Sequence, residues 1–194
     1  VWLHHFGESL YHRDFVSLID RIREYCKPRF SLSTNGTIFT EENINKVLNS
    51  DIDRLYVCLD GNTPEEYEKY RYPAKFKKVK ESFVNFLETK GNKDKPYVEI
   101  QVIDFPKTDK NSILLKWEPY RVKVGFKKAG AWNGEHKDIC DIVGKKMKLR
   151  EKSCSIIENG NEMTFLWNGD VVACCLDYNG KIVIGNVNKD LLPS

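Results

Sequence analysis

The chain has 194 residues, with 31 Lys and Arg against 28 Asp and Glu, which gives a formal net charge of +3. Hydrophobic residues make up 41% and charged residues 30%, a globular composition that excludes a disordered chain. The charges are of mixed sign, so the sequence has no basic patch typical of nucleic-acid binding. No run approaches the roughly 18 apolar residues of a membrane helix, and the first residues do not resemble a signal peptide. We therefore expect a cytoplasmic protein with neither nucleic-acid nor membrane partners.

Strand and helix patterns alternate over the first 126 residues. Strands are expected over 2–6, 30–33, 55–59, 97–103 and 122–126. Helices are expected over 15–26, from Thr40 past Leu48, from Thr63, over 76–87 with Gly91 as a stop, and over 112–117. Thr63, Pro64 and Glu66 have the spacing of a capping box. This alternation predicts an α/β fold with a parallel sheet, and five strands are too few for an eight-unit barrel of roughly 250 residues. We expect a partial (β/α) barrel.

The composition changes near residue 127, and a small β unit is expected after it. Residues 127–160 are polar and contain glycine, which is typical of a linker. Two strands over 163–167 and 170–177 flank Asn168-Gly169, a strong signal for a type I′ hairpin. We place the domain boundary at 130, with residues 131–194 as linker and β appendix.

Both ends of the chain read as cut. It starts without Met, inside a strand pattern, and residues 191–194 add no closing element. We expect a fragment of a longer protein.

Polar clusters follow three of the expected strands, at 7–9, at 33–36 and at 60–61. Ligands of parallel α/β folds bind at the carboxyl ends of strands, so these clusters are candidate binding loops. The carboxylate of Glu8 suits an ammonium group, whereas the hydroxyls and amide of Ser33, Thr34 and Asn35 suit a ribose or a carboxylate. The same residue types also favour turn geometry alone, so a purely structural interpretation stays open.

Six cysteines are spread unevenly, and four lie in the last 55 residues, which disfavours a disulfide scaffold. Cys26 and Cys58 lie in apolar patterns and are interpreted as small core residues. Near the hairpin, thiolates can converge on an iron–sulfur cluster or on zinc, while a buried, non-ligating role remains an alternative. The candidate ligands are Cys154, Cys174, Cys175 and Cys140. The four histidines have no metal-binding spacing, and core or surface roles are expected for them.

Four motifs resemble the radical S-adenosylmethionine (radical SAM) superfamily, in its branch with a C-terminal SPASM or twitch domain. Residues 6–9 resemble the GGEP motif, and residues 33–44 resemble the segment at the third strand. Residues 58–71 resemble the SxDG segment with its following helix. Cys154, fourteen residues, Gly169, four residues and Cys174 are similar to the first half of the SPASM pattern. The order and spacing of these motifs carry the resemblance over roughly residues 2–187.

The resemblance implies S-adenosylmethionine (SAM) and [4Fe–4S] clusters as cofactors. Gly7 and Glu8 would hold the amino group of SAM, and Arg71 would pair with its carboxylate. The other implied SAM-site residues are Ser33, Thr34, Asn35, Cys58 and Asp60. Cys154 and Cys174 would ligate an auxiliary cluster, Cys175 and Cys140 are further candidates, and Asp177 is a candidate acid or base.

The reaction implied by the resemblance is reductive cleavage of SAM, followed by hydrogen abstraction from a peptide, sugar or other small molecule. An electron donor such as flavodoxin or ferredoxin would be a partner. The CxxxCxxC loop of the radical cluster is absent and is expected before Val1, and the later SPASM cysteines are expected after Ser194. The 194 residues alone are therefore expected to be inactive.

Departures from the family motifs keep two alternatives open. Phe6, Ser9 and Cys58 replace a Gly, a Pro and a Ser of the motifs. These replacements favour a non-catalytic scaffold that keeps the fold. The other alternative is an unrelated α/β binding domain with a zinc-bound β appendix.

Overall fold

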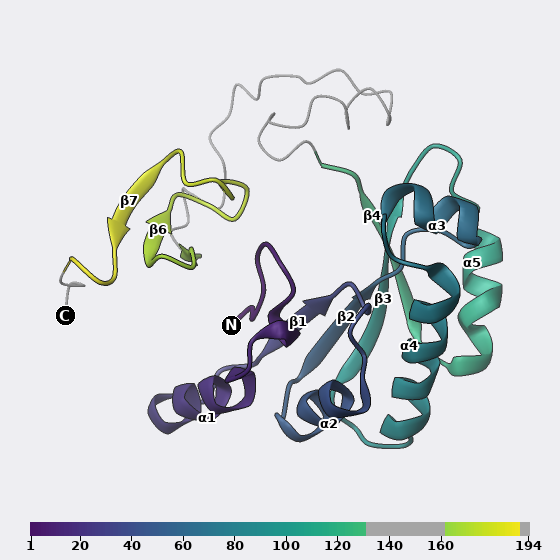
Figure 1. Cartoon of the computed structure of the whole chain (residues 1–194), viewed down its shortest axis with the longest axis horizontal. Helices are drawn as coiled ribbons and strands as arrows, with labels where there is room; N and C mark the ends of the chain where they lie inside the picture. Colours follow the sequence, from purple (N-terminus) through teal and green to yellow (C-terminus); the bar gives the residue numbers. More distant parts are fainter. Residues whose placement is uncertain (131–161, 191–194) are drawn as a thin grey trace. The chain divides into compact units, whose positions relative to one another are not determined.

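The structure, a computed structural model, describes residues 1–130 and 162–190 (Figure 1). The chain divides into two compact units, Val1–Lys128 and Ala129–Ser194. Cys140 and Cys154, two of the predicted metal ligands, lie outside the described residues.

The first unit is built on four parallel strands in the order β1-β2-β3-β4. Their bounds are β1 Ser31–Thr34, β2 Arg54–Cys58, β3 Tyr97–Asp104 and β4 Lys123–Lys128. The helices are η1 Ser9–Tyr11, α1 Phe15–Tyr25, α2 Glu41–Asn49, α3 Pro64–Tyr70, α4 Phe76–Lys90, α5 Lys110–Trp117 and η2 Glu118–Tyr120. The predicted α/β fold with a parallel sheet is confirmed.

The prediction of a first strand over 2–6 is wrong. Trp2 forms one isolated parallel bridge with Ser31, held by Leu3 N donating to Ser31 O at 2.8 Å. One step further along, Ser33 N donates to the His4 ring at Nδ1 instead of to a backbone carbonyl (2.9 Å). The side chain of His4 therefore takes the place of the next ladder bond, and the strand ends after one bridge.

Two predicted helix caps are confirmed. The Thr40 hydroxyl accepts from Asn43 N, and the Thr63 hydroxyl accepts from Glu66 N at 3.3 Å. The carboxylate of Glu66 accepts from Asn62 N at 2.7 Å, one residue earlier than the capping box predicts. This bond ties the turn before α3 to the first turn of the helix.

The two faces of the sheet differ in character. One face packs against the helices and forms the core with Leu55, Val57, Ile100 and Val102, each at most 1% exposed. Figure 1 shows α2, α4 and α5 along this side of the sheet. The opposite face has no helix over it within residues 1–130, and we call it the helix-free face. Its residues include Ser33, Tyr56, Cys58, Glu99, Gln101, Ile103, Lys123, Gly125 and Lys127.

The prediction that Cys26 is a core residue is wrong, and Cys58 is not on the core side of its strand. Cys26 is exposed at the end of α1, where the buried stripe of the helix has already ended. The Cys58 thiol lies 3.3 Å from the Ser33 hydroxyl on the helix-free face and is partly exposed. Strand alternation turns it away from its core neighbours Val57 and Leu59.

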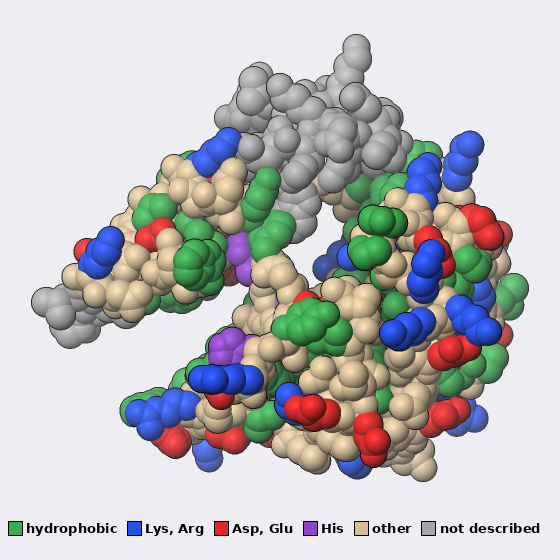
Figure 2. All heavy atoms as spheres, viewed as in Figure 1, with side chains coloured by type: hydrophobic (Ala, Val, Ile, Leu, Met, Phe, Trp, Pro, Cys, Tyr) green, Lys and Arg blue, Asp and Glu red, His purple; other side chains and the backbone are tan. Residues whose placement is uncertain are grey.

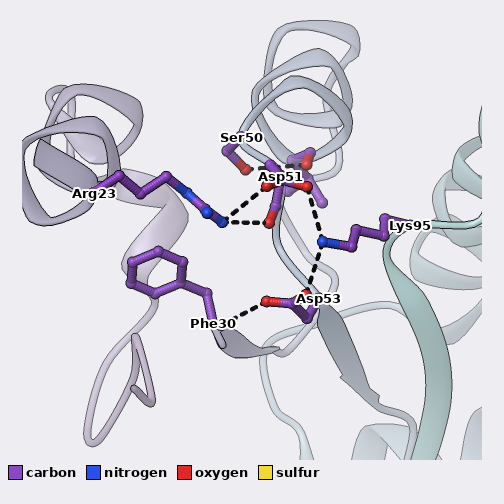
Figure 3. A network of polar contacts seen from close by, with 7 residues as sticks. Arg23, Phe30, Ser50, Asp51, Asp53 and Lys95 are labelled. Atoms are coloured by element: carbon purple, nitrogen blue, oxygen red, sulfur yellow. Dashed lines mark hydrogen bonds and ion pairs between the residues drawn. The ribbon is translucent and has the colours of Figure 1, made fainter. Parts of the chain in front are cut away.

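A polar network joins the loops at the amino ends of the strands (Figure 3). Lys95 bridges Asp51 and Asp53 at 3.1 and 2.9 Å, and Arg23 pairs with Asp51 at 3.1 Å. Asp53 also accepts from Phe30 N at 2.9 Å. Burial acts to raise the pKa of Asp53, but the hydrogen bonds from Lys95 and Phe30 N hold the pKa below its ordinary value. In folds of this type the amino-terminal edge of the strands serves stability.

The second unit contains a small antiparallel sheet of β5 Thr164–Phe165, β6 Asp170–Val172 and β7 Val183–Asn186. The predicted type I′ turn is wrong. Gly169 has a positive φ of 86°, but Asn168 does not have the second positive φ that a type I′ turn requires. Gly169 N donates to Leu166 O at 3.0 Å, so the turn spans Leu166–Gly169. Gly169, the last residue of this turn, has a left-handed backbone conformation.

The described residues contain no membrane-spanning helix, and charges of both signs are mixed on the face drawn in Figure 2. Within residues 1–130 and 162–190, no helix combines the length and apolarity needed to cross a bilayer. On the face drawn in Figure 2, Lys and Arg side chains are interspersed with Asp and Glu over the α/β unit. This pattern agrees with the net charge of +3.

Candidate functional site

The candidate site lies at the carboxyl ends of β1 and β2, and Glu8 is at its centre. One carboxylate oxygen of Glu8 accepts from the Thr34 hydroxyl at 2.9 Å and from Asn35 N at 2.8 Å. The other oxygen is buried and has no hydrogen-bond partner among the described residues. A buried acceptor of this kind costs free energy unless it receives a donor, so this oxygen is available for a ligand.

The loop after β1 is fixed by its own side chains. Thr34 is 2% exposed, and its hydroxyl accepts from Gly36 N at 3.1 Å while donating to Glu8. The side-chain oxygen of Asn35 accepts from both the amide and the hydroxyl of Thr37 at 2.9 and 2.6 Å. These bonds fix the loop so that the backbone N–H of Asn35 points toward Glu8.

Two glycines bring backbone close to the site. Gly7 has a φ of 100°, and a Cβ built on it would meet no atom within 4 Å, so open space borders its backbone. Gly61 has a φ of 127°, and a Cβ there would lie 2.7 Å from Tyr67 N. Gly61 is therefore required by the tight approach of α3, whereas Gly7 leaves room for a ligand.

Asp60 and Arg71 form a buried ion pair beside these loops. One Asp60 oxygen accepts from Arg71 Nε at 2.7 Å and Nη2 at 2.5 Å, and the other accepts from Ile103 N at 2.6 Å. Burial acts to lower the pKa of Arg71, but the charge of Asp60 outweighs it and raises the pKa above its ordinary value. Asp60 thus links β3 to Arg71 and fixes the guanidinium, which keeps 31% of its side-chain surface exposed.

His4 contacts the backbone of Ser33, whose hydroxyl lies beside the Cys58 thiol. Its Nδ1 accepts from Ser33 N, which requires a neutral ring at that nitrogen. Burial, followed by the charge of Lys127, lowers the pKa of His4 to about 4. The ring is therefore neutral at physiological pH and serves as an acceptor.

A small cavity of about 60 Å³ adjoins the ion pair. It is lined by Asp60, Gly61, Glu66, Tyr70, Phe105, Lys107 and Thr108. The rings of Tyr70 and Phe105 stack at 4.1 Å and form one wall. The cavity has room for a few atoms beside the loop that follows β2.

In the second unit, Cys174 and Cys175 are partly exposed, and neither forms a disulfide with another described residue. No group of three or more His, Cys, Asp or Glu side chains that could hold a metal occurs within residues 1–130 and 162–190. Asp177 is 5% exposed, and its two oxygens accept from Lys181 N and Ile182 N at 2.9 and 2.7 Å. In this arrangement Asp177 organises the loop before β7.

The structure brings together most residues that the sequence singled out for the first unit. Glu8, Thr34 and Asn35 share one hydrogen-bonded group, Ser33 contacts Cys58, and Asp60 holds Arg71. Sequence reasoning gave His4 only a core or surface role and did not predict its contact with Ser33 N.

Two family models match the chain. Residues 3–99 match the radical SAM superfamily. Residues 154–193 match SPASM, an iron-sulfur cluster-binding domain. The first match includes all the predicted SAM-site residues, which run from Gly7 to Arg71.

Individual relatives agree with these matches. A probable GTP 3',8-cyclase of Methanococcus maripaludis is 32% identical over 82 residues, which cover 42% of this chain and 27% of that protein. SuiB of Streptococcus suis bound to its precursor peptide SuiA is similar in structure, with a TM-score of 0.62 and 12% identity over 95% of this chain and 51% of that one. BtrN in complex with AdoMet and 2-DOIA has a TM-score of 0.55 and 19% identity over 96% of this chain and 57% of that one. These structures show a shared fold, and the chain spans about half of their length.

Proposed function

The chain belongs to the radical SAM superfamily, and on this basis we propose that it binds SAM at the carboxyl ends of β1 and β2 and takes part in radical chemistry on a further substrate. The curated relative carries the name of a cyclase, and BtrN was solved with AdoMet bound. The proposed activity is that of the whole protein that contains these residues.

The observation that carries the proposal is the free oxygen of Glu8. A carboxylate with one oxygen fixed by Thr34 and Asn35 and the other buried without a partner is preorganised to accept from an ammonium group. The amino group of SAM supplies such a donor. The open space beside Gly7 lets that group approach the backbone as well as the side chain.

The remaining residues have positioning roles in this proposal. Arg71 is held in place by Asp60 and keeps part of its guanidinium exposed, so its free N–H groups can meet the SAM carboxylate. The Ser33 hydroxyl and the Cys58 thiol lie 3.3 Å apart on the helix-free face and are the proposed contacts of the ribose. The neutral ring of His4 keeps the Ser33 backbone in place without adding a charge.

The implied metal cofactors are [4Fe–4S] clusters. A radical cluster, when bound, supplies the electron that cleaves SAM, and the protein then holds the fragments and excludes water. Cys174, and Cys154 outside the described residues, are the proposed ligands of an auxiliary cluster, with Cys175 and Cys140 as further candidates. The substrate is a peptide, a sugar or another small molecule, and flavodoxin or ferredoxin is the proposed electron donor. We place the protein in the cytoplasm, a reducing compartment that suits cysteines which form no disulfide among the described residues.

The test uses the complete product of the gene that encodes these residues, reconstituted anaerobically with iron and sulfide and reduced with dithionite. We expect 5′-deoxyadenosine to form from SAM. Glu8→Gln should reduce that rate about 10- to 100-fold, because a hydrogen bond to a charged group contributes about 1.5–3 kcal/mol. Glu65→Gln, an exposed residue in the first turn of α3, is the matched control and should keep the rate.

The alternatives give different outcomes in the same preparation. Iron–sulfur absorption with no 5′-deoxyadenosine would favour a non-catalytic scaffold. Zinc without iron in the anaerobic protein would favour the zinc-bound appendix. Either result would contradict the proposal.

A further inference from the structure

Tyr67, on α3, has a buried hydroxyl group without a partner. The residue is 0% exposed, and its ring packs against Phe76 with the ring centres 5.4 Å apart. The hydroxyl is closed to solvent, and it makes no hydrogen bond with any of the described residues. Because a buried hydroxyl without a partner costs free energy, we expect it to gain one in another state of the protein.

The Tyr67 side chain lies beside the ion pair of Asp60 and Arg71. Arg71 N, at the end of the same helix, donates to Tyr67 O at 2.9 Å. Gly61, the neighbour of Asp60, approaches so closely that a Cβ on it would lie 2.7 Å from Tyr67 N. Burial raises the pKa of Tyr67 to about 12, and among the charges that act on this pKa those of Arg71 and Asp60 act most strongly. Tyr67 is therefore a protonated donor next to both members of the pair.

The carboxylate of Asp60 can accept one more hydrogen bond. An ionised carboxylate has about four acceptor positions. Asp60 accepts two bonds from Arg71, at 2.7 and 2.5 Å, and one from Ile103 N at 2.6 Å. Asp60 is 4% exposed, so water has little access to the fourth position. An open donor and an open acceptor therefore lie near each other in the interior without forming a bond.

A ligand carboxylate at Arg71 would change the charge balance of this group. In the structure the one positive charge of Arg71 faces the one negative charge of Asp60. A second carboxylate on the exposed part of the guanidinium, as the proposed function requires, would share that positive charge. The buried carboxylate of Asp60 would then be only partly neutralised, which is costly unless another donor stabilises it.

We propose that Tyr67 is a positioning residue whose hydroxyl donates to Asp60 when Arg71 binds the carboxylate of SAM. This bond compensates Asp60, so that Asp60 keeps Arg71 in place while the guanidinium meets the ligand. Tyr67 touches neither the ligand nor the reacting atoms, and its effect reaches SAM through Asp60 and Arg71. The inference rests on the proposed function, because it requires SAM at Arg71.

The test measures ligand affinity in the complete product of the gene that encodes these residues, reconstituted anaerobically. Calorimetry gives the Kd of SAM and of S-adenosylmethioninamine, the analogue that lacks the carboxylate. Tyr67→Phe removes only the hydroxyl and should weaken SAM binding at least tenfold, the usual effect of losing a hydrogen bond to a charged group. The Kd of the analogue should stay unchanged, and so should the Tm of the ligand-free protein, where the hydroxyl has no partner among the described residues. Tyr25→Phe, at an exposed position of α1, is the matched control and should change neither Kd nor Tm.

Each other outcome for Tyr67→Phe overturns the inference. An unchanged Kd of SAM would show that Tyr67 has no part in SAM binding. An equal loss for SAM and for the analogue would show that the hydroxyl does not act through the carboxylate. A lower Tm of the ligand-free variant would show that the hydroxyl already has a partner in the free protein.

The same measurements separate the inference from the proposed function. If Glu8→Gln weakens SAM binding while Tyr67→Phe does not, the inference is wrong and the proposed function stands. If the parent protein binds no SAM, the proposed function fails, and the inference fails with it.

Discussion

Replacing Asp60 with Asn should destabilise the first unit by about 3 kcal/mol. The substitution keeps the size of the side chain and removes its charge, so two charge-assisted bonds to Arg71 are lost while the bond from Ile103 N can persist. Removing one partner of a buried ion pair costs about 3–5 kcal/mol. Asp60 is 4% exposed, but Arg71 keeps 31% of its side-chain surface and can recruit water, which places the cost at the lower end.

Urea unfolding followed by the helical circular dichroism signal measures this cost, because all helices among the described residues belong to the first unit. For a chain of this length 1 kcal/mol moves Tm by about 2–4 °C, so Tm should fall by roughly 6–12 °C. Asp94→Asn, an exposed position without an ion pair within the described residues, should change stability by less than about 0.5 kcal/mol. Equal effects of the two substitutions would refute the assigned role of the ion pair.

Three further predictions concern other parts of the first unit. Gly61→Ala should cost at least about 2 kcal/mol, measured by urea unfolding, because its φ of 127° strains any side chain and the new Cβ would meet Tyr67 N at 2.7 Å. Because the folded pKa of Asp53 is lowered, the stability it contributes is present above its unfolded pKa and is lost as pH falls through its folded pKa. Lys95→Met should reduce this acid-dependent loss in unfolding curves at successive pH values, and an unchanged pH dependence would contradict the assignment. His4 should titrate by NMR near its folded pKa of about 4. Because the unfolded ring is half protonated near pH 6.5, stability should fall by at most about 3 kcal/mol as pH drops through 6.5 toward 4. A midpoint near 6.5 would refute the burial of His4 as a neutral acceptor.

The elements of the fold were predictable because their signals are local. Helical and strand periodicities identified the βα alternation, and Thr40 and Thr63 marked the starts of two helices. The prediction of a first strand over 2–6 was wrong for a reason that hydrophobic periodicity does not encode. His4 accepts the Ser33 amide with its ring, and the ladder ends after one bridge. The prediction of a type I′ turn at Asn168-Gly169 was wrong because only Gly169 of the two residues has a positive φ.

The candidate site was predictable as a set of loops but not as a set of contacts. Glu8 and Asn35 are 27 residues apart, and the resemblance placed both near SAM without indicating that one holds the other. Arg71 was expected to face a ligand carboxylate, and the structure shows that Asp60 fixes it. Such pairings depend on how the strand ends converge in three dimensions, which composition and spacing do not determine.

The most direct test of the central claim is an NMR titration of the isotope-labelled chain with SAM, followed residue by residue. We predict the largest saturable shifts at the amides of Thr34, Asn35 and Gly36, and their loss in Glu8→Gln. Shifts confined to the opposite edge of the sheet, around Asp51 and Lys95, or no saturable shift at all, would contradict the proposal that Glu8 and the loop after β1 form the SAM site.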